Sequence, residues 1–139
     1  MNIAYSFFES YVQHNGDTMA KILIAEDDRA TLEIFSSAVE SMGHSVIRAT
    51  NGQMAWDVLQ ANDDIALLVS DMSMPEMEGQ ELLRLIRECG RFSKLPILVV
   101  SGAIRAREIA HLLEKGVTHF MPKPVQLQEF KDVIMRYVL

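Results

Sequence analysis

Short apolar runs alternate along this chain with longer segments in which apolar residues recur every three or four positions. The five runs cover residues 21–25, 45–49, 65–70, 96–100 and 117–121. Apolar runs of this length are typical of strands buried on both faces of a parallel sheet, and the segments between them have the period of amphipathic helices. The alternation predicts an α/β fold in which a doubly wound, five-stranded parallel sheet lies between two helical layers, a three-layer α/β/α sandwich.

The segments between the runs carry the signals that begin and end helices. Asp28 is suited to cap a helix that begins at Arg29, and Gly43 is suited to end it. Thr50 and Gln53 have the spacing of a capping box at the start of the next helix. In the last two helices the period places the following side chains against the sheet: Ile109, Leu112, Leu113, Leu127, Phe130, Val133, Ile134 and Tyr137.

The third apolar run ends in Asp71, and Pro75 forces the chain out of the sheet soon afterwards. In open parallel sheets, ligands bind beyond the carboxyl ends of the strands. Asp71 is therefore placed where such folds carry out their chemistry. An aspartate at a strand end is equally typical of a simple turn, so this position alone supports both interpretations.

The composition is that of one globular domain: the 139 residues are 49% hydrophobic and 23% charged. The net charge of −6 argues against nucleic-acid binding within this chain, which would need a basic patch, and fits a carboxylate site that takes a cation. The single cysteine, Cys89, excludes an internal disulfide and favours a reducing, cytoplasmic location. No apolar run approaches the roughly 18 residues of a membrane span.

Residues 1–20 differ from the rest of the chain. They are rich in aromatic side chains, but Glu9 interrupts the aromatic stretch, and the segment lacks the basic start and unbroken apolar core of a signal peptide. Met19 stands just before the first predicted strand. We expect a loosely held N-terminal extension over 1–20 and a folded domain over 21–139.

Polar side chains follow four of the five predicted strands. Glu26 and Asp27 follow the first strand, Asp71 the third, Ser101 the fourth and Lys123 the fifth. Because the carboxyl ends of parallel strands meet at one edge of a sheet, we expect these five side chains to converge.

Such a cluster has a definite chemistry. Adjacent carboxylates repel each other unless a cation offsets their charge, and an oxygen-only ligand set suits Mg²⁺. Lys123 and Ser101 add donors for the oxygens of an anion. A metal, an ammonium and a hydroxyl around a carboxylate are what phosphoryl transfer onto that carboxylate requires. In this interpretation Asp71 is the nucleophile.

Taken together, these residues resemble the response-regulator receiver domain, the phosphoacceptor half of two-component signalling, in its stand-alone, chemotaxis-regulator-like form. The resemblance covers about residues 21–139. It rests on an acidic pair after the first strand, Asp-x-x-Met-Pro after the third, Ser-Gly after the fourth and Lys-Pro after the fifth. It implies the flavodoxin-like strand order 2-1-3-4-5. It also implies a signalling protein that catalyses its own Mg²⁺-dependent phosphorylation and dephosphorylation.

The resemblance also implies a metal site. By position, Asp71 resembles the phosphorylated aspartate of the family, which is also a metal ligand, and Asp27 resembles the direct Mg²⁺ ligand. Glu26 resembles the second acidic residue, which often acts through water, and the main-chain carbonyl of Ser73 resembles a further ligand.

Three other positions resemble the phosphate-binding and switching parts of the family. Lys123 resembles the phosphate-binding lysine, and the Lys123–Pro124 bond is expected to be cis. Ser101 resembles the switch hydroxyl, and Phe120 falls where the family keeps its switch aromatic. The family often has tyrosine there. Phenylalanine keeps the part of the switch that depends on burial but offers no hydroxyl for a hydrogen bond.

The partners implied are a histidine kinase or phosphotransfer protein, or a small phosphodonor, and an output protein. Partners of the family read the face made by the fourth helix, the fifth strand and the last helix, sometimes as a homodimer. No effector domain follows Leu139, so a stand-alone receiver and a fragment of a longer regulator both fit the sequence.

Other functions fit the same architecture. A degenerate receiver would act as a phosphorylation-independent binding module, but it normally lacks the aspartate, the acidic pair or the lysine, all of which are present here. A haloacid-dehalogenase-type phosphatase would have a second aspartate where this chain has Ser73. A flavodoxin would have a hydroxyl-rich phosphate loop after the first strand, where this chain has three acidic residues, 26–28.

Overall fold

The computed structural model describes residues 20–74, 77–102 and 105–138. Within them, five parallel strands form one sheet in the order β2-β1-β3-β4-β5. The doubly wound sheet and the strand order are as predicted. The strands are β1 (Lys21–Ala25), β2 (Ser45–Ala49), β3 (Ile65–Ser70), β4 (Ile97–Ser101) and β5 (His119–Pro122).

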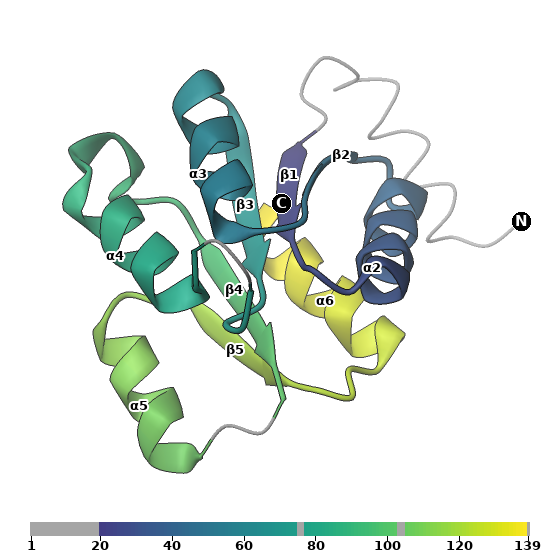
Figure 1. Cartoon of the computed structure of the whole chain (residues 1–139). Helices are drawn as coiled ribbons and strands as arrows, with labels where there is room; N and C mark the ends of the chain where they lie inside the picture. Colours follow the sequence, from purple (N-terminus) through teal and green to yellow (C-terminus); the bar gives the residue numbers. More distant parts are fainter. Residues whose placement is uncertain (1–19, 75–76, 103–104, 139) are drawn as a thin grey trace, which may run out of the picture.

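Helices cover both faces of the sheet (Figure 1). They are α2 (Arg29–Ser41), α3 (Gly52–Ala61), α4 (Gly79–Glu88), α5 (Ala106–Glu114) and α6 (Leu127–Val138), with a short 3-10 turn, η2 (Gly90–Phe92), after α4. Helices α3, α4 and α5 lie on one face, and α2 and α6 lie on the other. None of the helices in the described residues is long and apolar enough to cross a membrane.

Each face of the sheet has its own apolar core. On the α2–α6 face, the rings of Phe35 and Phe130 stack with their centroids 4.5 Å apart. On the other face, Trp56 meets Phe92 edge-on at 6.0 Å. Because the central strands are buried on both sides, they are apolar at nearly every position and do not alternate with polar residues.

The caps of two helices differ in how well the sequence predicts them. Asp28 caps α2 as predicted, since its side chain accepts the N–H of Thr31 at 3.0 Å. The prediction of Thr50 as the cap of α3 is wrong. Asn51 caps this helix, and its side chain accepts the N–H of Met54 at 2.7 Å. Threonine and asparagine are both good N-caps, so their order in the sequence does not decide which residue ends the loop.

Two leucines predicted to pack against the sheet are exposed instead, Leu113 at 47% and Leu127 at 41%. Consecutive residues point about 100° apart around a helix, and in α5 it is Leu112 that faces the sheet. Leu127 is the first residue of α6 and lies about one turn before the fully buried Phe130. Both leucines are apolar residues just outside the stripe that their helices bury.

The register of the strands sets the edge at which the site forms. Hydrogen bonding between neighbouring strands continues one residue past their ends. The Asp71 N–H donates to the Ala25 carbonyl at 3.0 Å, and the Lys123 N–H donates to the Ser101 carbonyl at 3.0 Å. The main chain therefore holds the residues after β3 and β5 beside those at the ends of β1 and β4. The Lys123–Pro124 peptide bond is cis, as expected.

Candidate functional site

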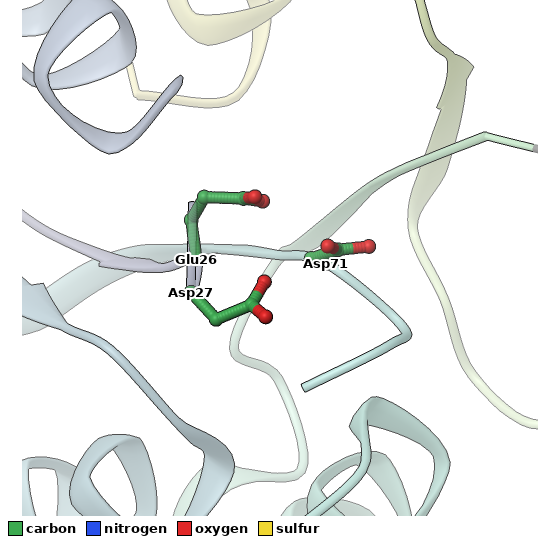
Figure 2. Close-up of side chains that lie close together, drawn as sticks. All are labelled: Glu26, Asp27 and Asp71. Carbon is green, nitrogen blue, oxygen red and sulfur yellow. The ribbon is translucent and has the colours of Figure 1, made fainter. Parts of the chain in front are cut away.

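Three carboxylates converge at the carboxyl edge of the sheet. Glu26 and Asp27 extend from the end of β1 and Asp71 from the end of β3, with the Asp27 carboxylate turned toward that of Asp71 (Figure 2). One oxygen from each of the three groups lies within 4.8 Å of the others. The convergence predicted for these three residues is confirmed.

The three carboxylates differ in exposure. Glu26 is 2% exposed and Asp71 is 8% exposed, while Asp27 lies in solvent. Burial raises the pKa of Glu26 to about 7, and the negative charge of Asp71 adds to this rise. Lys123 and the Asp28 N–H, which donates to Glu26 Oε1 at 3.3 Å, act in the opposite direction. Burial of Glu26 and the charge of Asp71 together therefore outweigh the favourable contacts that Lys123 and the Asp28 N–H make with the charged form of Glu26.

Lys123 supplies the positive charge of the site. Its Nζ lies 3.3 Å from both oxygens of Glu26 and 3.5 Å from Asp71 Oδ2. Burial alone would lower the pKa of Lys123, but the charges of Asp71 and Glu26 outweigh this effect and raise it. The ammonium is therefore charged at neutral pH and stands between the two buried carboxylates.

The loop after β3 holds the other side of Asp71. The Met72 N–H donates to Asp71 Oδ1 at 2.7 Å, and the Ser73 N–H approaches the same oxygen at 3.4 Å. The two oxygens of Asp71 thus have different surroundings: Oδ1 faces main-chain donors and Oδ2 faces Lys123. Ser73, expected to offer its carbonyl to a metal, lies two residues from the carboxylate and is exposed.

Ser101 lies at the same edge, but its hydroxyl makes no hydrogen bond to the described charged side chains of the site. It is buried at the end of β4, and its Oγ donates to the Gly102 carbonyl at 3.4 Å. Phe120 is half-buried in β5 and packs against the core of the α3–α4–α5 face. Its register partner in β4 is Val99, which lies two residues before Ser101. Side chains two residues apart share a face of a strand, so Ser101 and Phe120 lie on the same side of the sheet.

Part of the site could not be found from the residue types. The donors to Asp71 and Glu26 from residues 72, 73 and 28 are main-chain N–H groups, which nearly every residue carries. Gly79 is a second example. Its N–H donates to the Met72 carbonyl at 2.9 Å, which closes the loop that follows Asp71. Only a glycine at the start of α4 marks this contact in the sequence.

The comparisons with known proteins agree with this geometry. The family model of the response regulator receiver domain matches residues 22–135, and the chain belongs to this family. It is 32% identical over 113 residues to a chemotaxis protein CheY homologue of Campylobacter jejuni, covering 81% of this chain and 87% of that protein. It is also 32% identical over 120 residues to the response regulator protein FleR of Pseudomonas aeruginosa, covering 86% of this chain and 25% of FleR.

A solved structure shows the same fold. The chemotaxis response regulator CheY4 of Vibrio cholerae superposes with a TM-score of 0.79 at 25% identity, covering 87% of this chain and 99% of that one. The receiver fold thus recurs both in proteins of about this length and as one part of a longer regulator such as FleR.

The donor set fits a divalent cation. Glu26, Asp27 and Asp71 offer only carboxylate oxygens, which are the ligands that Mg²⁺ prefers in proteins. The exposure of Asp27 leaves one side of the cluster open to solvent, and Mg²⁺ usually keeps several waters. A bound cation would also favour the charged form of Glu26, whose pKa is raised first by burial and second by the negative charge of Asp71.

Proposed function

We propose that this receiver domain accepts a phosphoryl group on Asp71 and thereby changes the surface that it presents to a protein partner. The donor is the phosphohistidine of a histidine kinase or phosphotransfer protein, or a small phosphodonor. The observation that carries the proposal is the position of Asp71, whose carboxylate lies within reach of the Lys123 ammonium and close to two further carboxylates, those of Glu26 and Asp27.

Each bond that forms in this phosphoryl transfer is matched by one that breaks. An Asp71 oxygen attacks phosphorus in line, the bond from phosphorus to the donor atom breaks, and its electron pair returns to the imidazole nitrogen or the acyl oxygen of the donor. The product is a mixed anhydride between Asp71 and phosphate. Attack of water on phosphorus later returns the carboxylate and releases inorganic phosphate.

The side chains of the chain have separate tasks in this reaction. Asp27 and Asp71, with Glu26 acting through water and the Ser73 carbonyl, would hold Mg²⁺. When bound, Mg²⁺ offsets negative charge on the phosphoryl oxygens. Lys123 already lies 3.5 Å from Asp71 Oδ2 and is positioned to pair with a phosphoryl oxygen.

The phosphorylated state is recognised by a partner through the surface of α5, β5 and α6. Ser101 donates to a phosphoryl oxygen and gives up its contact with Gly102, and Phe120 on the same side of the sheet moves into the space beside it. Phosphorylation shifts this equilibrium only as far as the phosphoryl group prefers one arrangement over the other. The same surface would join two copies of the chain where the output is a homodimer.

A phosphorylation-independent binding module is the second candidate, but no observation favours it. Such a domain has no need of a buried acid pair and a lysine, whose enclosure costs free energy. All of these groups are present and converge.

The test is phosphorylation by acetyl phosphate in the presence of Mg²⁺, followed by the intact mass of the protein. We expect the mass of one phosphoryl group on the parent chain, and no gain in EDTA or in Asp71→Asn. The matched control is Asp57→Asn, which changes an exposed aspartate on α3 and should leave the gain intact. An Asp71→Asn variant that gains the full mass would place the phosphoryl group elsewhere. A parent chain that gains none, from acetyl phosphate or a histidine kinase, would favour the binding module.

A further inference from the structure

Gly52, the first residue of α3, lies against the loop that follows Asp71. A Cβ atom at this position would lie 2.2 Å from the Met77 carbonyl oxygen and 2.8 Å from the Met77 Cβ. Ordinary contacts of a Cβ begin at 3.4 Å, so residue 52 has no room for any side chain. Its φ is outside the left-handed region, unlike that of Gly43 or Gly116. Glycine is therefore required at position 52 for close approach and not for backbone conformation.

A second glycine, Gly79, makes an equally close contact with the start of the same loop. Gly79 begins α4, and a Cβ there would lie 2.6 Å from the Asp71 carbonyl oxygen and 2.7 Å from the Met72 Cα. The Gly79 N–H donates to the Met72 carbonyl at 2.9 Å. Met77 lies only two residues before this closed contact, so a displacement of Met77 is passed on to a junction that has no free space.

The described residues of the loop, 72–74 and 77–78, are also held from the side of the core. Helices α3 and α4, whose first residues Gly52 and Gly79 contact the loop, lie side by side on one face of the sheet (Figure 1). Met74 is 6% exposed, and Met72 and Met77 pack against the core of that face. The loop is therefore anchored by three apolar side chains as well as by its two glycine contacts.

We propose that Gly52 is a positioning residue for the phosphoacceptor site, acting through Met77 and the loop to set where Asp71 and the Ser73 carbonyl lie. The inference rests on the function proposed above. A Cβ at position 52 and the Met77 carbonyl oxygen would have to separate by about 1 Å to reach an ordinary contact, whereas metal–ligand distances hold within about 0.2 Å. A misplacement of about 1 Å at a reacting group lowers rates by about 10²-fold.

The test compares Gly52→Ala with Gly90→Ala. Nothing lies within 4 Å of a Cβ built on Gly90, so this variant controls for the loss of a glycine. Urea midpoints report folding, and NMR in EDTA reports the amide shifts of Met72 and Ser73, whose N–H groups face Asp71 Oδ1. Calorimetric titration gives the Kd for Mg²⁺.

We expect Gly52→Ala to fold, to shift the Met72 and Ser73 amides without metal, and to raise the Mg²⁺ Kd by roughly 10-fold or more, as supporting-residue changes at metal sites do. Gly90→Ala should stay within about twofold of the parent. Unshifted Met72 and Ser73 amides together with an unchanged Kd in a folded Gly52→Ala would overturn the proposal. So would a Kd that rises equally in both variants.

If Gly52→Ala does not fold, the comparison moves to a Met77→Gly background, where the loop has no Cβ to clash with and a more compliant backbone. The double variant should then fold and bind Mg²⁺ more weakly than Met77→Gly alone. Equal affinities, or a double variant that also fails to fold, would give Gly52 a purely structural role.

These measurements are independent of phosphoryl transfer. A parent chain that binds Mg²⁺ but gains no phosphoryl mass would contradict the proposed function. The effect of Gly52 on the loop and on Mg²⁺ affinity would still be decided by the shifts and the titration.

Discussion

The Lys123 ammonium lies closer to Glu26 than to Asp71: its Nζ is 3.3 Å from both Glu26 oxygens and 3.5 Å from the nearest Asp71 oxygen. The single positive charge of Lys123 is thus shared between two buried carboxylates, those of Glu26 and Asp71. Enclosing an ion pair costs desolvation that the attraction between the partners does not always recover. With two carboxylates to one lysine, an excess of negative charge stays buried, and burial together with the charge of Asp71 raises the pKa of Glu26, which is 2% exposed.

Glu26→Gln should therefore stabilise the protein in EDTA above neutral pH. The pKa of Glu26 is raised from 4.5 to about 7, so between these values the folded state binds more protons than the unfolded state, and the free energy of unfolding falls as pH rises. Glutamine does not ionise, so the variant should lack this fall and exceed the parent at pH 8 by about 1–3 kcal/mol. Urea midpoints from pH 5 to pH 8 measure the difference.

Asp27→Asn is the matched control for this experiment, since it removes a charge from the exposed member of the cluster. Its midpoint in EDTA should change less than that of Glu26→Gln. If Glu26→Gln is the less stable protein at pH 8, the Glu26–Lys123 pair contributes more to stability than its burial costs.

Mg²⁺ binding should depend more on Asp27 than on Glu26, the reverse of their expected order in the stability experiment. Asp27 faces solvent beside Asp71 and is the proposed direct ligand, while Glu26 is proposed to act through water. Asp27→Ala should therefore weaken Mg²⁺ binding more than Glu26→Ala, by roughly 10-fold or more against a smaller loss. Isothermal titration with Mg²⁺ measures both. Equal losses would show that the two carboxylates share the metal.

The sequence was sufficient to predict the sheet, because strands buried on both faces must be apolar throughout, and polar residues then mark the strand ends. It placed Glu26, Asp27 and Asp71 together on that basis alone. It did not distinguish the buried acid from the exposed one, because Glu26 and Asp27 are neighbours and their enclosure depends on tertiary packing. The close approach of Met77 to Gly52 was equally hidden, since it joins the first residue of α3 to a residue of the loop after β3, 25 positions further along the chain.

The N-terminal segment should be dispensable for the chemistry. Residues 1–18 precede β1 and supply none of the proposed site groups. A chain that begins at Met19 should fold with a similar urea midpoint and gain the phosphoryl mass from acetyl phosphate at a similar rate. Insolubility of the shortened chain would indicate that Phe7, Phe8 and Tyr11 pack on the domain or on a second copy. The full chain under identical conditions is the control.

Phosphorylation of Asp71 is expected to change the positions of residues in α5 and β5, which lie outside the site. Ser101 and Phe120 lie on the same side of the sheet, and among the described residues the only hydrogen bond of the Ser101 hydroxyl is to the Gly102 carbonyl. Ser101→Ala should still gain the phosphoryl mass on Asp71, because the proposed nucleophile and Lys123 are unchanged. It should nevertheless fail to pass the change on to α5 and β5. Phe120→Ala should uncouple in the same way and also lose about 2 kcal/mol of stability, less than a fully buried ring would cost.

The measurement is the NMR shift change of residues 105–121 on addition of Mg²⁺ and beryllofluoride, which stands in for the phosphoryl group on Asp71. The parent should shift throughout α5 and β5, and Ser101→Ala should shift only near Asp71. Thr118→Ala is the control, because its side chain accepts the Ile97 N–H at the opposite end of β4; it should shift like the parent. Equal shifts in Ser101→Ala and the parent would mean that Asp71 acts on this surface without the Ser101 hydroxyl.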